Sequence, residues 1–375
     1  MDADRPAATS QPPHHRQSRW LALVSGRAQG LMASLARAGL GVLSVAYRLG
    51  LGVANLRWHV PGSVHRPPCP VVSVGNLTVG GTGKTPMVAC LADLVTQMGG
   101  EPLIVSRGYG SDKGRPNDEA RELERLCPDV PHLQSPDRVR AIRDWVENHP
   151  CDVAILDDGF QHRRCARDLD IVLVDALRPF GYGHLLPYGL LREPLSALRR
   201  ADLVVITRAE LLGADELARL KETIGALVTG ETPMLLAEHR PTGILLPDGS
   251  RRGVEWLADR DVAAACAIAN PRAFRMTLEQ LAARVAPFDA FRDHHAYTAE
   301  ELNQLVGAAE AAGAKTLVTT GKDFVKWFPM IDAGEIASAV EVVALEVALR
   351  VTDGEDVLRS RIAPLLPGAK GQGEP

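Results

Sequence analysis

Residues 71–86, VVSVGNLTVGGTGKTP, combine residue types that bind phosphate groups. Four β-favouring residues lead into a glycine-rich bend, and Pro86 stands where proline is favoured at the start of a helix. Glycines allow backbone N–H groups to converge on one anion at the positive end of a helix. Lys84 would then contact the β- and γ-phosphates of a nucleotide, and the Thr85 hydroxyl would bind Mg²⁺.

The predicted phosphate loop departs at one position from the usual G-x-x-x-x-G-K-[ST] pattern, because Thr78 replaces the first glycine. A threonine restricts the backbone at the start of the loop but leaves the Gly-Lys-Thr end intact. The alternative interpretation is a glycine-rich turn with a solvated lysine. The expected nucleotide-binding residues are Thr78, Val79, Gly80, Gly81, Thr82, Gly83, Lys84 and Thr85.

A second motif, VAILDDGFQH at 153–162, supplies carboxylates. Its first four residues read as a buried strand, which places Asp157 and Asp158 at the carboxyl end of that strand. Carboxylates in this position can hold a Mg²⁺ ion that bridges nucleotide phosphates. An acidic pair at a strand end is otherwise often a turn cap, but its occurrence after the phosphate loop favours the metal site.

The elements that would position these residues alternate short apolar runs with helix-sized segments. The runs are rich in β-branched residues and do not alternate with polar ones, which is typical of buried parallel strands. We therefore expect a doubly wound, mostly parallel α/β sheet of the P-loop type. The predicted strands of this sheet are 71–74, 103–105, 153–156, 171–174, 203–206 and 234–237.

A second, smaller α/β domain is predicted after a proline- and glycine-rich stretch, and a chain of 375 residues is long enough for both. Its expected strands are 262–268, 317–319 and 340–345, with a helix at 299–312. The expected organisation is a disordered tail (1–18), a membrane-associating helical segment (19–66), a P-loop kinase core (67–238), a linker (239–254), the smaller domain (255–367) and a loose tail (368–375).

Residues 20–58 are apolar and helix-prone, with tryptophan or tyrosine towards the ends. The window 38–56 is long enough to span a bilayer, but Arg48 inside it costs roughly 2.5–3.5 kcal/mol on insertion scales. Four glycines between residues 39 and 52 weaken a continuous helix further. We favour one or two helices that lie in the membrane interface. A spanning helix and a helix packed on the body of the protein are the alternatives.

Charge is distributed unevenly along the chain. Residues 1–66 contain eight arginines against Asp2 and Asp4, a net charge of +6, so the remainder carries −10 of the total of −4. A basic, apolar N-terminal segment favours an anionic surface, and the overall charge gives no case for nucleic acid. Six cysteines without a C-x-x-C pair argue against a disulfide framework or a zinc site and indicate a reducing compartment.

The two motifs, together with several later stretches, resemble the tetraacyldisaccharide 4′-kinase family of lipid A biosynthesis. The matching stretches run in family order between residues 71 and 326: VVSVGNLTVGGTGKTP, SRGYG, NDEA, LDDGFQHRR, LLPYGLLREP, AIANPRAF, DHHAYT and TGKDFVK. The family's loop also lacks the first glycine, so Thr78 is consistent with a working site. This chain departs from the family pattern at Asn117, Ala120 and Gly321.

The resemblance implies an ATP- and Mg²⁺-dependent kinase that phosphorylates the 4′-hydroxyl of a tetraacylated glucosamine disaccharide 1-phosphate to give lipid IVA. The implied partners are this acylated lipid and the inner leaflet of the membrane, bound peripherally or monotopically, and no nucleic acid. The implied location is the cytoplasmic face of the inner membrane. Residues 20–66 would be the membrane-associating segment of the family.

The resemblance also assigns roles to individual residues. Asp118 would be the base that accepts the proton of the sugar hydroxyl, paired with His294. Arg192 would meet phosphate or transition-state charge. The implied magnesium ligands are Thr85, Asp157, Asp158 and Glu193.

Each of these roles has a structural alternative. Asp118 could cap the helix that begins near it, and His295 could take the place of its neighbour His294. Arg192 and Glu193 could form a surface ion pair, and His162 could equally be near the metal or packed in the structure. Two other functions also remain open: a membrane-tethered P-loop nucleotide switch without an acceptor base, and a soluble P-loop kinase for a small metabolite.

Overall fold

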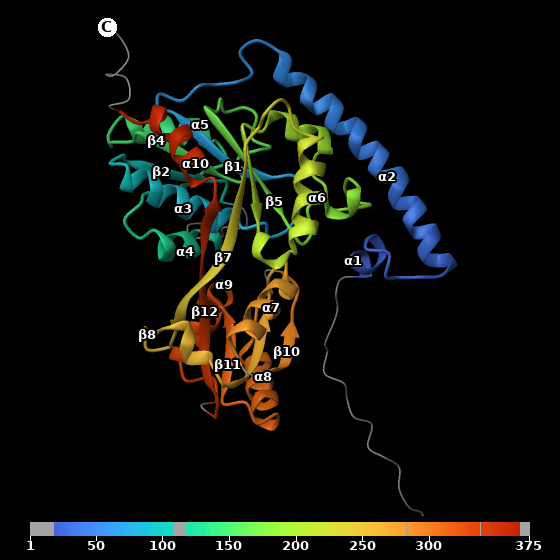
Figure 1. Ribbon diagram of the computed structural model, residues 1–375, viewed down its shortest axis with the longest axis vertical. Coiled ribbons are helices and arrows are strands. Elements are labelled where there is room, and N and C mark those ends of the chain that lie inside the picture. The colour runs from blue at the N-terminus through green and yellow to red at the C-terminus, as the bar shows by residue number, and fades with distance from the viewer. Residues whose placement is uncertain (1–18, 109–117, 283, 294, 338, 368–375) are drawn as a thin grey trace, which may run out of the picture. The chain divides into compact units, whose positions relative to one another are not determined.

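The computed structural model describes residues 19–108, 118–282, 284–293, 295–337 and 339–367. The chain forms two compact units (Figure 1). The core unit comprises residues 29–243 and 346–375, and the small unit comprises residues 1–28 and 244–345. The chain passes between the units along two long strands, β7 (Met234–Leu245) and β12 (Glu341–Asp353).

The core unit contains a mostly parallel sheet whose strand order is β7-β6-β5-β1-β4-β2-β3. Its first six strands are β1 (Val71–Asn76), β2 (Pro102–Ser106), β3 (His132–Gln134), β4 (Val153–Asp157), β5 (Leu169–Asp175) and β6 (Leu203–Thr207). Strand β1 pairs in parallel with β4 and β5, and all of its residues are buried. The six predicted strands are all present, which confirms the α/β class. The short edge strand β3 was not predicted because its three residues are too few to show a pattern.

Helices cover both faces of this sheet. They are α3 (Lys84–Gln97), α4 (Asp118–Leu126), α5 (Arg138–Val146), α6 (Ala214–Gly225) and α10 (Glu355–Ile362). Alternate residues of each strand point to opposite faces, so Val72 and Val74 pack with α3, whereas Val71 packs with α5. The arrangement is the doubly wound architecture that the apolar runs predict.

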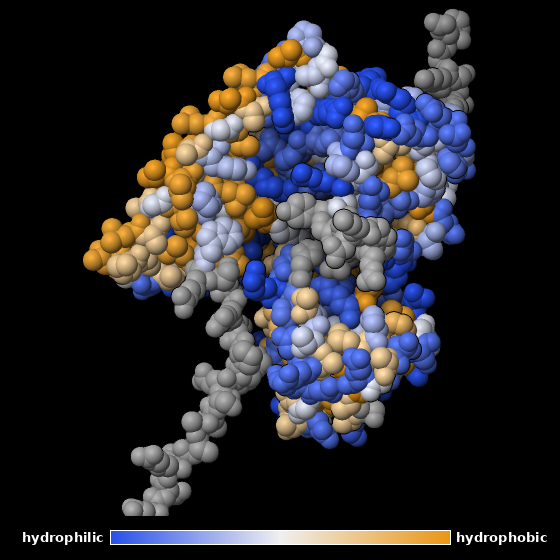
Figure 2. Space-filling view, turned by 180° about the vertical axis from the view of Figure 1, so that it is seen from behind, coloured by the Kyte–Doolittle hydropathy of each residue, from blue (hydrophilic) through white to orange (hydrophobic). Residues whose placement is uncertain are grey.

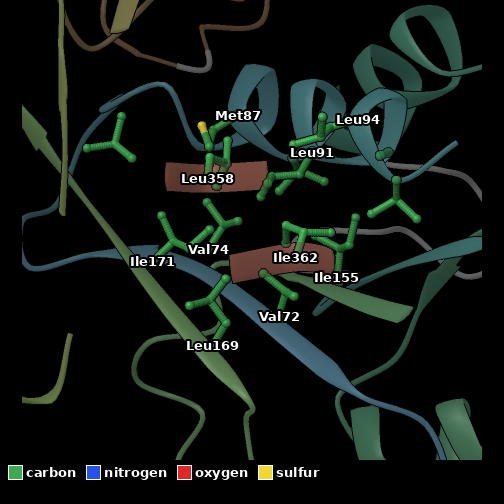
Figure 3. Close-up of a cluster of buried hydrophobic side chains, with 14 of the residues drawn as sticks. Val72, Val74, Met87, Leu91, Leu94, Ile155, Leu169, Ile171, Leu358 and Ile362 are labelled. Atoms are coloured by element: carbon green, nitrogen blue, oxygen red, sulfur yellow. The ribbon is translucent and has the colours of Figure 1, made fainter. Parts of the chain in front are cut away.

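Residues 346–367 lie in the core unit, whereas the predicted smaller domain extends to 367. Figure 3 shows Leu358 and Ile362 of α10 in one buried cluster with Met87 and Leu91 of α3. Within the predicted linker 239–254, β7 extends to Leu245 and pairs with β8 (Arg251–Arg252). Apolar spacing marks a segment as buried, but it does not specify which surface buries it.

The small unit is a second α/β layer, as predicted. Its strands β9 (Asp261–Cys266), β10 (Arg284–Ala290) and β11 (Thr316–Thr320) join β12 in the order β10-β9-β11-β12, and the register pairs are parallel. Its helices are α7 (Pro271–Leu281), α8 (Ala299–Ala311) and α9 (Gly321–Asp332). Trp327 is fully buried and packs with Leu302 and Phe324 in its core.

The N-terminal region contains α1 (Arg19–Val24) and α2 (Leu31–Leu56), followed by one short turn, η1 (Arg57–His59). Helix α2 is continuous over 26 residues, so the predicted weakening by glycines does not break it. Within the described residues, Leu31–His59 is the one stretch long and apolar enough to cross a membrane, judged by length and composition alone. No residue of α2 is fully buried.

Helix α2 has two different sides. Its half-buried residues recur mostly every three or four positions and therefore form one stripe: Ala33, Arg37, Leu40, Gly41, Ser44, Tyr47, Leu51 and Asn55. The opposite side is apolar and exposed, with Val42 at 71% and Val53 at 70% of their full exposure. Figure 2 shows this side as a band of hydrophobic surface. Exposed apolar surface of this extent marks an interaction site.

Candidate active site

The phosphate loop lies where the sheet changes direction. From β1 the chain passes through α3 to β2 on one side, and later returns to place β5 on the other side of β1. In open α/β sheets, ligands bind at the carboxyl ends of the strands beside such a point. Gly80 and Gly83 adopt φ values of +117° and +90°, which favour glycine, and α3 begins at Lys84. The backbone geometry is that of an anion-binding loop.

Thr78 fits the loop because its backbone does not need glycine. Among the described non-glycine residues, positive φ occurs at Asp158, Tyr182, Arg208 and Asp259, so Thr78 has an ordinary conformation. Its carbonyl oxygen accepts a 2.8 Å hydrogen bond from Asn76 Nδ2. The prediction that the substitution leaves the loop intact agrees with this geometry.

Lys84 faces polar groups at the end of β1. Its Nζ lies 3.3 Å from Asn76 Oδ1 and 3.6 Å from Asp158 Oδ1, and its side chain is only 14% exposed. A cation held at this position, directly after the glycine turn, is placed to meet the terminal phosphates of a bound nucleotide.

Arg192 reaches the same place from the loop after β5. Its Nη1 and Nη2 donate to both oxygens of Asp158, at 2.8 and 3.0 Å, which is the bidentate arrangement of a strong ion pair. Nη2 also donates to Asn76 Oδ1 at 2.6 Å, and Nε donates to the Thr78 carbonyl at 3.2 Å. Lys84, Asp158 and Arg192, all predicted from sequence, therefore converge at the mouth of the phosphate loop.

The two cations keep Asp158 ionised. Burial of the Asp158 carboxyl would raise its pKa, but the positive charges of Lys84 and Arg192 outweigh burial and hold the pKa well below its usual range. For a lowered carboxyl pKa, the stabilisation is complete above the unfolded-state pKa and is lost only as the pH falls through the folded-state pKa. Asp158 therefore remains charged throughout the neutral range.

The carboxylates expected around magnesium do not form one cluster. Within the described parts of the chain, no group of three or more His, Cys, Asp or Glu side chains could hold a metal ion. Glu193 is buried and pairs with Arg200, at 2.8 and 3.1 Å, and with Gln161. Asp157 is buried at the carboxyl end of β4, and Thr85 is half-buried in the first turn of α3.

These contacts also correct the alternative of an Arg192–Glu193 surface pair, because the two residues bind different partners. Chain neighbours of opposite charge do not have to face each other, and here the backbone directs Arg192 towards Asp158 and Glu193 towards Arg200. Each carboxylate therefore compensates an arginine, and each arginine is held in one orientation.

The sequence did not predict a group of residues at and just after the end of β6 that hydrogen-bond to the backbone of the phosphate loop. Arg208 donates to the Gly81 carbonyl at 3.2 Å and to Asp175 at 2.8 Å, and Thr207 Oγ1 donates to the Thr82 carbonyl at 2.9 Å. Arg208 has a strained φ of +58°. One signal was available, since Asp175 ends a buried strand just as Asp157 does.

The turn that carries Asp158 packs directly on β1 through two glycines. A Cβ added to Gly75 would lie 2.4 Å from Phe160 Cβ and 2.7 Å from the Phe160 backbone nitrogen. A Cβ added to Gly159 would lie 2.6 Å from Ser73 Oγ. The close approach of these two segments brings Asp158 next to Lys84.

Gly75→Ala is therefore expected to destabilise the core unit by about 1–3 kcal/mol, the usual effect of overpacking a tight interior. The expected result is a lower urea midpoint together with weaker nucleotide binding. Gly39→Ala on α2 is the matched control, because nothing lies within 4 Å of its added Cβ. An unchanged urea midpoint for Gly75→Ala would show that the turn containing Phe160 can shift away from β1 without loss of stability.

The structure describes neither the side chain of the predicted base, Asp118, nor its predicted partner, His294. Asp118 is the first residue of α4, and its side chain is not described. His294 and Asn117 lie outside the described residues. Ala120, one of the departures from the family pattern, is buried near the start of α4.

The neighbour of His294 has a structural role. His295 stacks on Phe291, with ring centroids 4.9 Å apart, and its Nε2 lies 3.1 Å from the Glu301 carboxylate. Lys326 donates to the His295 carbonyl oxygen at 3.2 Å. These contacts fix the backbone beside residue 294, and they occupy the imidazole of His295.

The TGKDFVK stretch makes further contacts in the small unit. Lys322 pairs with Asp293 at 3.2 Å, and Asp323, fully buried, accepts from the Ala267 backbone N–H at 2.8 Å. Gly321 begins α9, so its backbone has a defined role without a side chain. His162 is half-buried, and burial together with nearby arginines lowers its pKa to about 4, so its ring is neutral.

Comparison with known proteins agrees with this geometry. The family model described as tetraacyldisaccharide-1-P 4′-kinase matches residues 36–366. A tetraacyldisaccharide 4′-kinase of Syntrophus aciditrophicus is 40% identical over 316 residues, which cover 78% of this chain and 84% of the relative. One of Geobacter metallireducens is 40% identical over 335 residues, covering 84% and 96%.

A solved structure is also similar. The crystal structure of LpxK from Aquifex aeolicus in complex with ATP matches with a TM-score of 0.65 and 29% sequence identity. The match covers 88% of this chain and 99% of that one.

Proposed function

Since the chain belongs to the tetraacyldisaccharide 4′-kinase family, and so phosphorylates the 4′-hydroxyl of the acylated disaccharide of lipid A biosynthesis, we propose how its residues do so. The observation that carries the proposal is the convergence of Lys84, Arg192 and Asp158 at the mouth of one glycine-rich loop. Such a site provides positive charge around the phosphoryl group during its transfer, and this electrostatic stabilisation is a main requirement of phosphoryl transfer.

ATP is the proposed phosphoryl donor. Residues 80–83 lead directly into the start of α3, where the helix dipole favours negative charge and free backbone N–H groups can bind phosphate. Lys84 would bind the terminal phosphates, and Arg192 would exchange part of its contact with Asp158 for the transferred group. The similar protein from Aquifex aeolicus was crystallised with ATP, which supports this donor.

Mg²⁺ fits the residues that flank the loop, although they form no ready-made cluster. Magnesium is commonly held by one or two protein oxygens and completed by phosphates and water. The Thr85 hydroxyl and the Asp157 carboxylate are the proposed ligands, since they stand at the ends of the adjacent elements α3 and β4. When bound, the ion would neutralise charge on the phosphates. Asp158 and Glu193, both held by arginines, would act mainly by orienting Arg192 and Arg200.

Asp118 is the proposed base. A sugar hydroxyl is a weak nucleophile, and a positioned base that accepts its proton typically contributes about 10²–10⁴-fold. His294 is the proposed partner, because the imidazole of His295 is already bound to Glu301 and stacked on Phe291. This assignment needs the acceptor hydroxyl to reach Asp118 while its phosphoryl donor lies on Lys84.

The membrane surface is the proposed location, on the cytoplasmic face of the inner membrane. The exposed side of α2 presents leucine and valine, and the arginines of the N-terminal segment favour anionic head groups. A stripe of half-buried residues runs along the other side of α2, so only one side is open to lipid. An interfacial helix agrees with this better than a spanning helix, which lipid would surround.

The proposal predicts lipid-dependent ADP release. Purified protein with ATP, Mg²⁺ and the acylated disaccharide 1-phosphate in mixed micelles is expected to form one new phosphomonoester for each ADP. A reaction without the disaccharide is the control for background hydrolysis. Nucleotide hydrolysis that is equal in both reactions would instead support the nucleotide switch. Equal turnover of a deacylated disaccharide would support a soluble small-metabolite kinase.

A further inference from the structure

We propose that Tyr47 and Ser44 of α2 position the loop that carries Arg192, so that the membrane-facing helix also holds the phosphate-binding arginine in place. This inference rests on the proposed function for its consequence, but its geometry is independent of the substrate. Tyr47 and Ser44 would be positioning residues, since they touch the loop rather than the reacting groups.

The contacts are direct hydrogen bonds to the loop backbone. Tyr47 Oη donates to the Arg192 carbonyl oxygen at 3.1 Å, and Ser44 Oγ donates to the Leu185 carbonyl oxygen at 3.0 Å. Both donors lie on the half-buried stripe of α2, three residues apart and so on the same side of the helix. One helix face therefore holds both ends of the segment 185–192.

The same segment pairs with the phosphate loop on its other edge. The Arg192 N–H donates to the Leu77 carbonyl at 2.7 Å, and the Val79 N–H donates to the Leu190 carbonyl at 2.8 Å. Thr78 and Leu191 form an antiparallel bridge between these bonds. Residues 190–192 thus lie between α2 and the start of the phosphate loop, hydrogen-bonded to both.

Packing strengthens the connection. Tyr47 and Leu51 lie against the buried cluster that contains Leu185, together with Phe180 and Leu195. Burial of the Tyr47 hydroxyl, with a smaller effect from the charge of Glu193, raises its pKa above the usual value. The hydroxyl therefore remains a proton donor at neutral pH, as a bond to a carbonyl oxygen requires.

The consequence is a link between membrane contact and the active site. The exposed side of α2 is free to enter lipid while its stripe continues to hold the Arg192 loop. Two hydrogen bonds on a short loop matter because a shift of Arg192 by a fraction of an ångström would lengthen its four bonds to Asp158, Asn76 and Thr78.

The test is Tyr47→Phe, which removes only the hydroxyl, alone and combined with Ser44→Ala. At saturating ATP and lipid, we expect kcat to fall about two- to ten-fold for the single variant, the range for losing one hydrogen bond. The double variant should lose more. Vesicle co-sedimentation and the thermal midpoint should remain those of the wild type. Ser34→Ala is the matched control, because Ser34 is exposed on the same helix and its hydroxyl accepts a 3.3 Å hydrogen bond from Arg37 of that helix.

Two further measurements separate positioning from general damage. In an Arg192→Ala background, Tyr47→Phe should have no additional effect on kcat, because the two residues act as one unit. Hydrogen exchange of residues 185–192 should become faster in Tyr47→Phe, whatever the substrate. Unchanged exchange, or an equal loss of kcat with and without Arg192, would overturn the inference. A wild-type protein without lipid kinase activity would instead refute the proposed function.

Discussion

Asp118→Asn is expected to lower kcat by about 10²–10⁴-fold, the contribution of a positioned general base. Asparagine keeps the size and polarity of the side chain but cannot accept the proton of the sugar hydroxyl. The affinity for ATP, measured by equilibrium binding, should stay within about two-fold of the wild type, because the phosphate loop is formed by other residues.

Glu124→Gln is the matched control for this variant. It neutralises an exposed carboxylate on the same helix, α4, and should leave kcat unchanged. If Asp118 and His294 act together, His294→Ala should reduce kcat strongly, and the double variant should be little slower than the slower single one. Near-normal turnover by Asp118→Asn would exclude it as the base and favour a role in starting α4.

Lys84→Ala is the second large effect that we expect. Lys84 is the first residue of α3, and its ammonium group lies beside the phosphate-binding backbone. Losing one group that stabilises transition-state charge typically lowers kcat by about 10²–10³-fold. The affinity for ATP should fall as well. The arginine variant should not restore activity, since a planar guanidinium does not fit a site shaped for a point charge.

The control for Lys84→Ala is Lys221→Ala on α6. Lys221 is partly exposed and forms one 3.6 Å pair with Asp353, so its removal should change neither activity nor the thermal midpoint appreciably. A Lys84→Ala protein with wild-type activity would mean that the glycine turn is structural and that the phosphates bind elsewhere.

The site residues differed in how far the sequence alone could place them. Lys84 and Asp158 were predictable because each follows a buried strand, and strands that pair in parallel bring such ends to one edge of the sheet. Arg192 and Glu193 were recognisable as site residues only by family resemblance. Which carboxylate pairs with Arg192 or Arg200 depends on the backbone path between β5 and β6. The residue types next to each arginine in the sequence do not specify that path.

The sequence by itself determined the local features of this protein: the buried strands, the glycine turn, the long apolar helix and the family. These are set by residue type and by spacing over a few positions, through backbone freedom and the side from which apolar groups are buried. The tertiary structure decided what is distant along the chain. It packed α10 in the core unit and brought Arg208 to the phosphate loop, where it donates to a loop carbonyl. It also paired Glu193 with Arg200 and hydrogen-bonded Tyr47 to the Arg192 carbonyl. Those contacts join segments far apart in sequence, so they follow from the packing of the whole chain rather than from any one stretch of it.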